Sequence, residues 1–384
     1  MRILHVITTL DVGGAEMHLL TQVRGQAARG HAVTLAYLKG RGSLTGDFLA
    51  AGAERVVPVG QGPGLVWRLV PLLARADLIH SHLLKADAAT AVLATLCGRR
   101  GRLVSGKHND EQVLRRPLVS RVHGLLGRLP RLTIVLSDHV GRFIEEHGRV
   151  PRARQRRIYY GLDPEPFERA AAAPAAERSR LRAELGLDAG DVVFTCVARF
   201  APQKAHDVLL KAFAAVRAET PPGAPAARLL LVGDDPFGDG RRRAEALAAE
   251  LGLGSAAVFA GIRRDVPALL GASDAFVMSS LWEGLGLVFL EAMAAGLPVL
   301  STRVSAIPEV VVDGETGLLV PPREVEPLAA AWQRLAADPE LRRRLGTAGR
   351  RRVRERFGLE RMVEETLDAY ASVATVRGAA AGSG

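Results

Sequence analysis

Short runs of nearly uninterrupted apolar residues recur along the chain, and stretches with the spacing of amphipathic helices separate them. Such runs are typical of strands that are buried on both faces, as in parallel sheets. The predicted strands are residues 2–7, 32–37, 78–80, 103–105 and 134–137 in the first half, and residues 192–197, 228–233, 275–278 and 298–302 in the second. This alternation of strand and helix predicts an α/β protein with doubly wound sheets.

Length and composition indicate the number of domains. The chain has 384 residues, of which 48% are hydrophobic, so it is too long for one usual core and has enough apolar material for two. We expect a first domain over residues 1–168 and a second over residues 177–358. Alanine and proline dominate residues 170–176, which we interpret as the linker, and a last amphipathic helix is expected over residues 359–376.

Three features bear on where the protein works. No stretch is long and apolar enough to cross a bilayer, and Met1 leads into the first strand without a signal peptide. Cys97 and Cys196 are far apart in the sequence, so we expect neither a disulfide nor a cysteine metal site. These features favour a cytoplasmic protein.

One segment combines features that bind phosphate with two carboxylates. Residues 279–286 follow the predicted strand at 275–278 and contain glycines that let the backbone approach a ligand, and a helix is expected from Leu287. The free N–H groups and the dipole at a helix start favour an anion. Glu283 and Glu291 flank these amides, and carboxylates suit a phosphate only when groups with hydroxyls are attached to it. The segment therefore predicts a nucleotide-sugar site.

The same segment carries a resemblance to a known family. It reads EGLGLVFLEAMAAGLPV, and the spacing of Glu283 and Glu291 within it resembles the E-x7-E signature of glycosyltransferase family 4, which contains retaining enzymes. The resemblance implies the GT-B fold, in which two Rossmann-like, doubly wound domains face a central cleft. In proteins of this fold the last helix crosses back to the first domain.

Other segments extend the resemblance over almost the whole chain. Residues 13–16 read GGAE, as in many family members, and residues 198–205 resemble the GR…P-x-K-G segment that binds the diphosphate, with Ala198 and Ala205 in place of glycines. Residues 160–167 resemble the connection between the domains, with Tyr160 where Asn is usual. The implied donor site consists of Gly13, Gly14, Arg199, Lys204, Ile262, Arg263, Glu283, Gly284, Leu285, Gly286, Leu287, Val288 and Glu291.

The resemblance also implies roles for single residues. Glu291 would accept hydrogen bonds from ribose hydroxyls, and Glu283 from a hydroxyl of the donor sugar. Arg199 and Lys204 follow the strand at 192–197, where cationic side chains can hold phosphate oxygens and stabilise the leaving diphosphate. The predicted catalytic residues are His108, Glu283, Arg199 and Lys204.

Histidines and aspartates also lie at the ends of predicted strands. His108 follows the strand at 103–105 and is our candidate for the histidine that related enzymes place near the donor sugar and the acceptor. For His82 we favour a structural role. Asp234 and Asp235 form a pair of the kind that could bind a divalent metal, but their segment resembles a structural loop of the family, so no metal site is expected.

The expected reaction is transfer of a sugar, with retention, from a nucleotide-diphosphate sugar to a glycan, lipid-linked or small-molecule acceptor. A UDP-sugar is the favoured donor, no metal or further cofactor is expected, and the pathway is cell-surface polysaccharide or glycoconjugate biosynthesis. Two alternatives stay open. A nucleotide-sugar 2-epimerase of the GT-B fold needs the same donor pocket, and a non-catalytic nucleotide-sugar-binding subunit needs the pocket alone.

The net charge of +10 is concentrated in one region, because residues 99–157 hold 15 Lys/Arg against five Asp/Glu. Residues 115–128 alternate basic and apolar at helical spacing, which favours a helix on an anionic membrane surface, at the inner face of the plasma membrane. The alternative is a core-packed helix with a solvated basic face. Nucleic acid is a poor partner, because the basic residues are not interleaved with aromatic ones.

Overall fold

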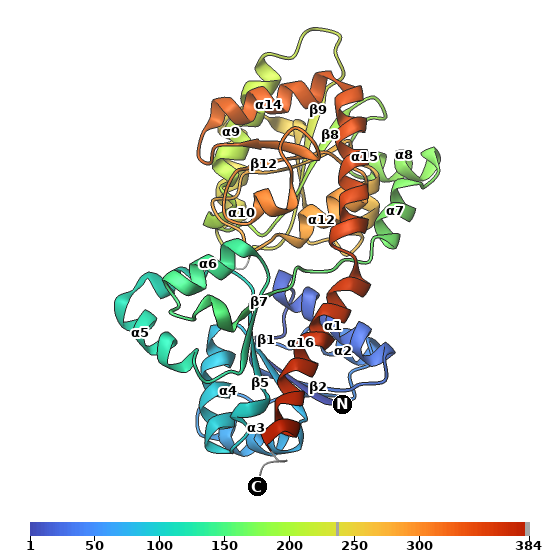
Figure 1. Cartoon of the computed structure of the whole chain (residues 1–384). Coiled ribbons are helices and arrows are strands. Elements are labelled where there is room, and N and C mark those ends of the chain that lie inside the picture. The colour runs from blue at the N-terminus through green and yellow to red at the C-terminus, as the bar shows by residue number, and fades with distance from the viewer. Residues whose placement is uncertain (236–237, 381–384) are drawn as a thin grey trace. The chain divides into compact units, whose positions relative to one another are not determined.

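A computed structural model of the chain describes residues 1–235 and 238–380, with side chains as far as residue 374. The chain divides into two compact units, one made of Met1–Gly161 and Leu359–Gly384 and the other of Leu162–Gly358. Each unit is built around its own parallel sheet, with helices packed on the strands (Figure 1). The predicted α/β class with two doubly wound sheets is confirmed.

The described part of the first unit contains a seven-stranded sheet in the order β3-β2-β1-β4-β5-β6-β7, and each neighbouring pair is parallel. Its strands are β1 (Arg2–Thr9), β2 (Ala32–Lys39), β3 (Arg55–Pro58), β4 (Leu78–His82), β5 (Leu103–Lys107), β6 (Leu132–Val135) and β7 (Gln155–Arg157). Its helices are α1 (Gly14–Ala28), α2 (Thr45–Ala50), α3 (Gly64–Arg75), α4 (Leu84–Leu96), α5 (Pro117–Leu126), α6 (Asp138–Glu146) and α16 (Leu359–Ala380).

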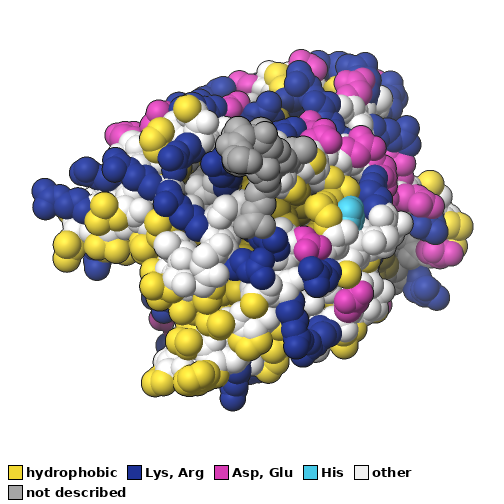
Figure 2. Space-filling model, turned by 60° about the horizontal axis from the view of Figure 1, so that its bottom comes forward, with side chains coloured by type: hydrophobic (Ala, Val, Ile, Leu, Met, Phe, Trp, Pro, Cys, Tyr) yellow, Lys and Arg dark blue, Asp and Glu magenta, His cyan; other side chains and the backbone are white. Residues whose placement is uncertain are grey.

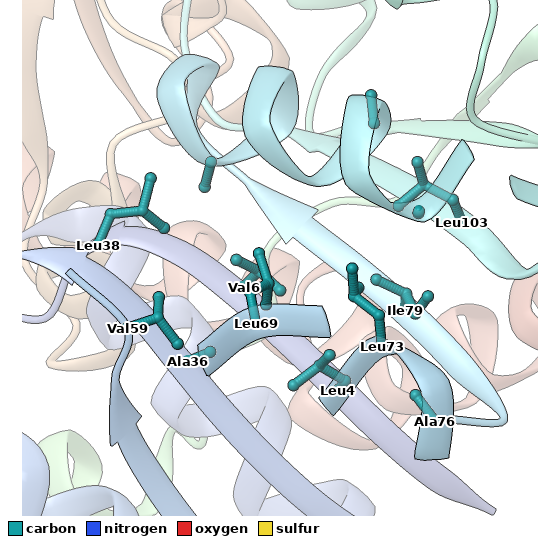
Figure 3. Close-up of a cluster of buried hydrophobic side chains, with 13 residues drawn as sticks. Leu4, Val6, Ala36, Leu38, Val59, Leu69, Leu73, Ala76, Ile79 and Leu103 are labelled. Atoms are coloured by element: carbon teal, nitrogen blue, oxygen red, sulfur yellow. The ribbon is translucent and has the colours of Figure 1, made fainter. Parts of the chain in front are cut away.

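Alternation along β1 separates the two faces of this sheet. Leu4 and Val6 join a buried cluster with side chains of α3 and α4, which Figure 3 shows. Ile3 packs with side chains of α16, and Ile7 packs with those of α1 and α2. Because successive side chains of a strand point to opposite faces, one face of the sheet is covered by α3 and α4 and the other by α1, α2 and α16.

The same period of two places three histidines on the face that α1 and α16 cover. Leu4 and Val6 face α3 and α4, so His5 between them faces the other side of the sheet, together with Ile3 and Ile7. In β4, Ile79 packs in the cluster of Leu4, so His80 and His82, one and three residues further along the strand, face the other side of the sheet. All three histidine side chains are buried.

The described part of the second unit contains a six-stranded parallel sheet in the order β10-β9-β8-β11-β12-β13. Its strands are β8 (Val192–Val197), β9 (Ala227–Val232), β10 (Ala257–Gly261), β11 (Ala275–Met278), β12 (Val299–Thr302) and β13 (Gly317–Val320). Its helices are α7 (Glu165–Ala171), α8 (Ala175–Glu184), α9 (His206–Ala218), α10 (Gly240–Glu250), α11 (Val266–Gly271), α12 (Leu287–Ala294), α13 (Ile307–Val310), α14 (Val325–Ala337) and α15 (Pro339–Arg356).

The linker predicted at residues 170–176 is wrong. This segment contributes the end of α7 and the start of α8, which both belong to the second unit. Phe167 of α7 is buried, and the buried Arg182 of α8 donates to the Asp274 carboxylate at 2.8 Å and to three backbone carbonyl oxygens. Alanine favours a helix, and these two anchors fix the helices, so the composition alone was misleading.

The chain passes between the units at Gly161 and again at Gly358, whereas the predicted first domain extends to residue 168. α16 belongs to the first unit, where Val363 and Tyr370 are buried against its sheet. The Tyr370 hydroxyl accepts a hydrogen bond from Gln22 of α1 at 3.2 Å. α16 therefore supplies part of the cover of the face that holds the histidines.

Candidate active site

Two central strands of the second sheet end beside the predicted donor residues. β8 lies between β9 and β11, so the order of the chain reverses there. Arg199 follows β8, and Glu283 lies in the loop that follows β11. In open α/β sheets, ligands bind outside the carboxyl ends of the strands at such a reversal. The second unit therefore presents these two residues where a ligand is expected.

Hydrogen bonds join the loops after β8 and β11. The Ser279 hydroxyl donates to the carbonyl oxygens of Lys204 and Ala205, each at 2.9 Å. The Leu281 N–H donates to the Gln203 carbonyl oxygen at 2.8 Å, and the Gln203 amide donates in return to the Trp282 carbonyl oxygen at 2.6 Å. The loop that carries Lys204 is thereby fixed against the loop that carries Glu283.

The helix start that was predicted as an anion site forms at the expected residue. α12 begins at Leu287, and Gly286 before it has a φ of +82°, which favours glycine. A side-chain carbon at Gly286 would also lie only 2.5 Å from the ring of Phe289. The first N–H groups of a helix have no partner within it, so this end of α12 is suited to a phosphate.

Lys204 and Glu283 form a buried ion pair at this edge of the sheet. Their side chains are only 12% and 7% exposed, and the Ser280 hydroxyl donates to the same carboxylate at 2.7 Å. The Lys204 ammonium also lies 3.8 Å from the sulfur of Met278. The two predicted catalytic residues are therefore brought together, and each charge holds the other in place.

Arg199 and Glu291 have no such partner. Within the described part of the chain, neither side chain makes a hydrogen bond or an ion pair, and Arg199 is exposed. Glu291 is half-buried in the first turns of α12, and burial raises the pKa of its carboxyl to about 7. An unpartnered carboxylate in a desolvated place is stabilised by a ligand that donates hydrogen bonds.

The remaining residues predicted in this unit have backbone or structural roles. The side chain of Ile262 is exposed, and the Arg263 guanidinium is held by Asp265 and Glu184, so the contact predicted for these two residues remains one through their backbone. Asp235 accepts hydrogen bonds from backbone N–H groups before and at the start of α10. This contact agrees with the structural reading of the aspartate pair.

In the first unit, the glycine turn after β1 is closed by a carboxylate. Gly13 precedes α1, and a side-chain carbon there would lie 2.5 Å from Glu16 Oε2. Glu16 is buried and accepts a hydrogen bond from the Thr9 hydroxyl at 2.6 Å. Glu16 therefore supports the turn, which leaves the backbone of Gly13 and Gly14 as the predicted contact.

His108 follows β5 and has internal partners on both ring nitrogens. Its Nδ1 lies 2.8 Å from the Tyr160 hydroxyl, and its Nε2 lies 2.9 Å from Nδ1 of His82. Tyr160 also stacks on His18 with ring centroids 3.9 Å apart, so its ring is held in place while its hydroxyl contacts His108. Burial lowers the pKa of His108 to about 3, with a further contribution from the charge of Lys107.

Sequence reasoning missed the partners of His108. His5, Gln26 and Tyr370 join His80 and His82 in one buried polar network. One nitrogen from each of His5, His80 and His82 lies within 4.8 Å of the other two, but five of the six nitrogens already make hydrogen bonds, so we assign no metal to them. The available signal was the placement of all three on the same face of adjacent parallel strands.

Comparisons with known proteins agree with this geometry. Residues 12–166 match the family described as Glycosyltransferase Family 4, and residues 177–352 match the family described as Glycosyl transferases group 1. The chain is 32% identical over 359 residues to a GDP-mannose-dependent alpha-(1-6)-phosphatidylinositol monomannoside mannosyltransferase of Mycolicibacterium smegmatis, covering 88% of this chain and 89% of that protein. It is 36% identical over 321 residues to a D-inositol 3-phosphate glycosyltransferase of Saccharomonospora viridis, covering 79% and 72%.

A solved structure has the same fold. The structure of HepE from Anabaena, in complex with UDP and glucose, superposes with a TM-score of 0.87 at 24% identity, covering 97% of this chain and all of that one. Two Rossmann-like units with this likeness define the GT-B fold. With a relative matched over nearly its full length, the chain belongs to the family-4 glycosyltransferases, as the E-x7-E segment predicted.

The buried histidines predict a stability that depends on acid pH. Burial lowers the pKa of His5 to about 4 and that of His108 to about 3, and it lowers those of His80 and His82 well below 6.5. Below pH 6.5 the unfolded chain binds protons that the folded chain does not, so each such histidine lowers the free energy of unfolding by about 1.4 kcal/mol per pH unit.

We therefore expect the free energy of unfolding to fall as the pH is lowered from 7 to 5, with uptake of several protons on unfolding. Urea unfolding at pH 5, 6 and 7 measures this directly. In the conservative variant His82→Gln, unfolding should take up about one proton fewer, so the free energy of unfolding should depend less steeply on pH. A free energy that stays constant between pH 7 and 5 would contradict the assignment of neutral buried histidines.

Proposed function

We propose that this glycosyltransferase takes its sugar from a nucleoside diphosphate sugar, retains the anomeric configuration and uses no metal ion. The observation that carries the proposal is the grouping of Arg199, Lys204 and the start of α12 at one edge of the second sheet. Glu291, without a partner in the described chain, lies on the same helix. Cationic and carboxylate groups side by side suit a ligand that has a diphosphate and hydroxyls.

The diphosphate is the leaving group, and it gains negative charge as the glycosidic bond breaks. Arg199, Lys204 and the N–H groups of α12 would stabilise this charge in a preorganised site. With these groups in place, no metal is needed, so activity should persist in EDTA. Inhibition by EDTA that manganese reverses would contradict this part of the proposal. In a retaining reaction the acceptor attacks the face that the diphosphate leaves, where the phosphate can assist its deprotonation.

The identities of donor and acceptor are proposals at the level of chemical class. One relative is named for GDP-mannose and the solved neighbour contains UDP and glucose, so both bases enter the first screen, with a UDP-sugar as our expectation. The names of the two relatives contain phosphatidylinositol and inositol 3-phosphate. We propose an acceptor that carries negative charge, which also fits the excess of basic residues at 99–157.

Product analysis with a labelled donor separates this proposal from the two alternatives. Transfer gives a labelled glycoside only when an acceptor is present. An epimerase converts the donor sugar without an acceptor, and a binding subunit gives no product from any donor that it binds.

The exposed surface of α5 supports the proposal that the protein binds to an anionic membrane. Leu118, Val122 and Leu125 are 73%, 49% and 67% exposed at spacings of four and three residues, while the buried positions of the helix are Ser120, His123 and Gly124. The helix therefore turns large apolar side chains outward, which supports the membrane proposal over the alternative of a core-packed helix with a solvated basic face.

Basic residues surround this apolar stripe. Arg115, Arg116, Arg121 and Arg128 are exposed around α5, and Figure 2 shows dark-blue and yellow side chains intermixed, with few magenta ones, over the left and lower parts of that view. No helix in the described chain has the length and hydropathy to span a bilayer. We propose peripheral binding at the inner face of the plasma membrane, in which apolar side chains enter the interface and each nearby arginine contributes about 1 kcal/mol.

The first prediction from this proposal concerns Glu291. Glu291→Ala should weaken binding of UDP or GDP by roughly 10- to 100-fold, because it removes hydrogen bonds to a charged group. The loss should disappear with the 2′,3′-dideoxy nucleotide, which lacks the ribose hydroxyls. In the wild type, affinity should rise between pH 6 and 8 as the carboxyl with a pKa of about 7 ionises, and Glu291→Gln should remove this rise.

Isothermal calorimetry measures these affinities, with Glu250→Gln on the exposed end of α10 as the control for charge. An equal loss with the ribo- and dideoxy nucleotides would show that Glu291 does not contact the ribose.

The second prediction concerns the exposed cation. Arg199→Ala should lower kcat by about 10²-fold or more, the usual cost of one preorganised charge-stabilising group, and Arg199→Lys should recover part of the loss. Arg242→Ala removes an exposed charge from α10 and should leave kcat unchanged. Arg199 is the sharper test than Lys204, because loss of Lys204 also leaves Glu283 without its buried partner. Steady-state rates within a few-fold of wild type for Arg199→Ala would place the diphosphate elsewhere.

The third prediction concerns the membrane. The protein should float with anionic vesicles but not with neutral ones, and high salt should weaken this binding. Leu118→Ser combined with Leu125→Ser should reduce vesicle binding. The control is Leu49→Ser, which removes an exposed leucine from α2, away from α5, and should leave vesicle binding unchanged. Equal flotation with both vesicle types, or with neither, would favour a soluble acceptor.

A further inference from the structure

A continuous series of hydrogen bonds runs through the buried face of the first sheet and ends at His108. The Tyr160 hydroxyl lies 2.8 Å from His108 Nδ1, and His108 Nε2 lies 2.9 Å from His82 Nδ1. His82 Nε2 lies 2.9 Å from His5 Nδ1, and His5 Nε2 lies 2.9 Å from the side-chain amide oxygen of Gln26. Each of the three imidazoles in the series therefore uses both ring nitrogens.

The far end of the series gives it a direction. The side-chain amide oxygen of Gln26 can only accept a hydrogen bond, so His5 carries its proton on Nε2 and accepts at Nδ1. A neutral imidazole has one donor and one acceptor nitrogen, so His82 donates from Nε2 to His5 and accepts at Nδ1. His108 must then donate from Nε2 to His82 and accept at Nδ1 from the Tyr160 hydroxyl. The tautomer of His108 with its proton on Nε2 satisfies every bond.

A second set of contacts orients the Gln26 amide. The amide nitrogens of Gln26 and Gln22 donate to the Tyr370 oxygen at 3.4 and 3.2 Å. The Tyr370 hydroxyl lies 2.7 Å from His80 Nδ1, to which it donates. The amide nitrogen of Gln26 thus faces α16 and its amide oxygen faces His5. Tyr370 of α16 therefore sets the direction in which hydrogen bonds are donated along the series.

The series also requires neutral imidazoles. A protonated imidazole donates from both nitrogens, so with the other rings in these tautomers a charge on His5 or His82 would set two donors against each other. The charged and titratable groups that face His108 are Lys107 of its own strand, His82 of β4, His18 of α1 and Tyr160. None of them is a carboxylate that would favour the charged ring, and burial lowers the pKa of His82 well below its usual value.

Room for the bond between His82 and His108 depends on Gly106 of β5. A side-chain carbon at this position would lie 3.1 Å from both His108 Nε2 and His82 Nδ1, and 2.8 Å from His80 Nε2. Even alanine would press on the atoms that make the bond. The sequence therefore provides three histidines from two strands, a fourth after β5 and a glycine that lets them meet.

We propose that His82 and His5 are positioning residues of the transferase, which hold His108 in a single neutral tautomer and ring orientation. This inference rests on the proposed function and on the role that the family resemblance implies for His108. His82 and His5 are buried and act only through His108. Through Gln26 and Tyr370 the series extends to α16, so the last helix of the chain contributes to the geometry of a residue at the end of β5.

The wild-type protein provides the first test. In protein labelled with ¹⁵N-histidine, long-range proton–nitrogen spectra show which nitrogen of each ring is protonated, and the signal absent from His108→Gln identifies His108. We expect the proton of His108 on Nε2 at pH 7. A proton on Nδ1 in the wild type would overturn the inference without any need for a second variant.

Two variants of His82 then separate positioning from packing. In His82→Leu the Nε2–H of His108 loses its acceptor, so the ring should change tautomer and donate from Nδ1 to the Tyr160 oxygen. In His82→Gln the amide oxygen can accept from His108 while its nitrogen donates to His5, so the tautomer should persist. We expect kcat to fall roughly tenfold or more in His82→Leu, with an unchanged KM for the donor, and to stay within about threefold of wild type in His82→Gln.

Val363→Ala is the matched control. Val363 of α16 is equally buried on this face, but its side chain makes no hydrogen bond to the series, to Gln26 or to Tyr370, so the variant should be destabilised without a change in the His108 tautomer or in kcat. If His82→Leu changes the tautomer and leaves kcat at the wild-type value, the inference is wrong while the proposed function stands. If the wild type transfers no sugar from any donor, the proposed function fails, and the spectra still decide the tautomer.

Discussion

A buried ion pair between Lys204 and Glu283 is the interaction on which the proposed donor site of the second unit depends. It joins the loops that follow β8 and β11, where the order of strands reverses. Removal of either partner would leave an uncompensated charge in a buried place, which is strongly destabilising, whereas an intact buried pair adds little net stability. Its position at the carboxyl edge of the sheet is therefore better explained by the ligand than by the fold.

Each unit contains a buried ion pair, Lys107 with Asp87 in the first and Lys204 with Glu283 in the second, but the other polar groups that they bury differ. The second unit places opposite charges together and leaves Arg199 exposed. The first unit buries neutral imidazoles, amides and phenols that satisfy one another through a shared direction of donation. Both solutions place a polar group of fixed geometry at the end of a central parallel strand, and both fix it through contacts between segments that are distant in the sequence.

Much of the fold was predictable because parallel strands buried on both faces are continuous apolar runs. The local structure around Glu283 and Glu291 was predictable as well, because an apolar run, a glycine loop and good helix formers follow one another there. The linker at 170–176 was misread because alanine occurs in helices and in low-complexity segments alike, and the anchor Arg182 finds its partners only in the folded chain. The outward apolar stripe of α5 could not be predicted, since periodicity shows that a helix has two faces but not which one is buried.

The histidine series shows another limit of the sequence. His5 and His82 lie in strands that are separated by α1, α2 and α3, and only the pairing of β1 with β4 brings them together. Tyr160 and Gln26 join from two further segments. Each of these residues alone has an ordinary structural interpretation, and their common direction of donation becomes visible only when all the distances are known.

The central claim is that the second unit binds a nucleoside diphosphate sugar whose anomeric configuration survives transfer. The most direct measurement is the proton NMR spectrum of the glycoside formed from an α-linked donor, recorded early in the reaction. The coupling constant of its anomeric proton is expected to be that of an α-glycoside. A β-glycoside as the first product would contradict the retaining mechanism and the assignment of the diphosphate as the group that assists the acceptor.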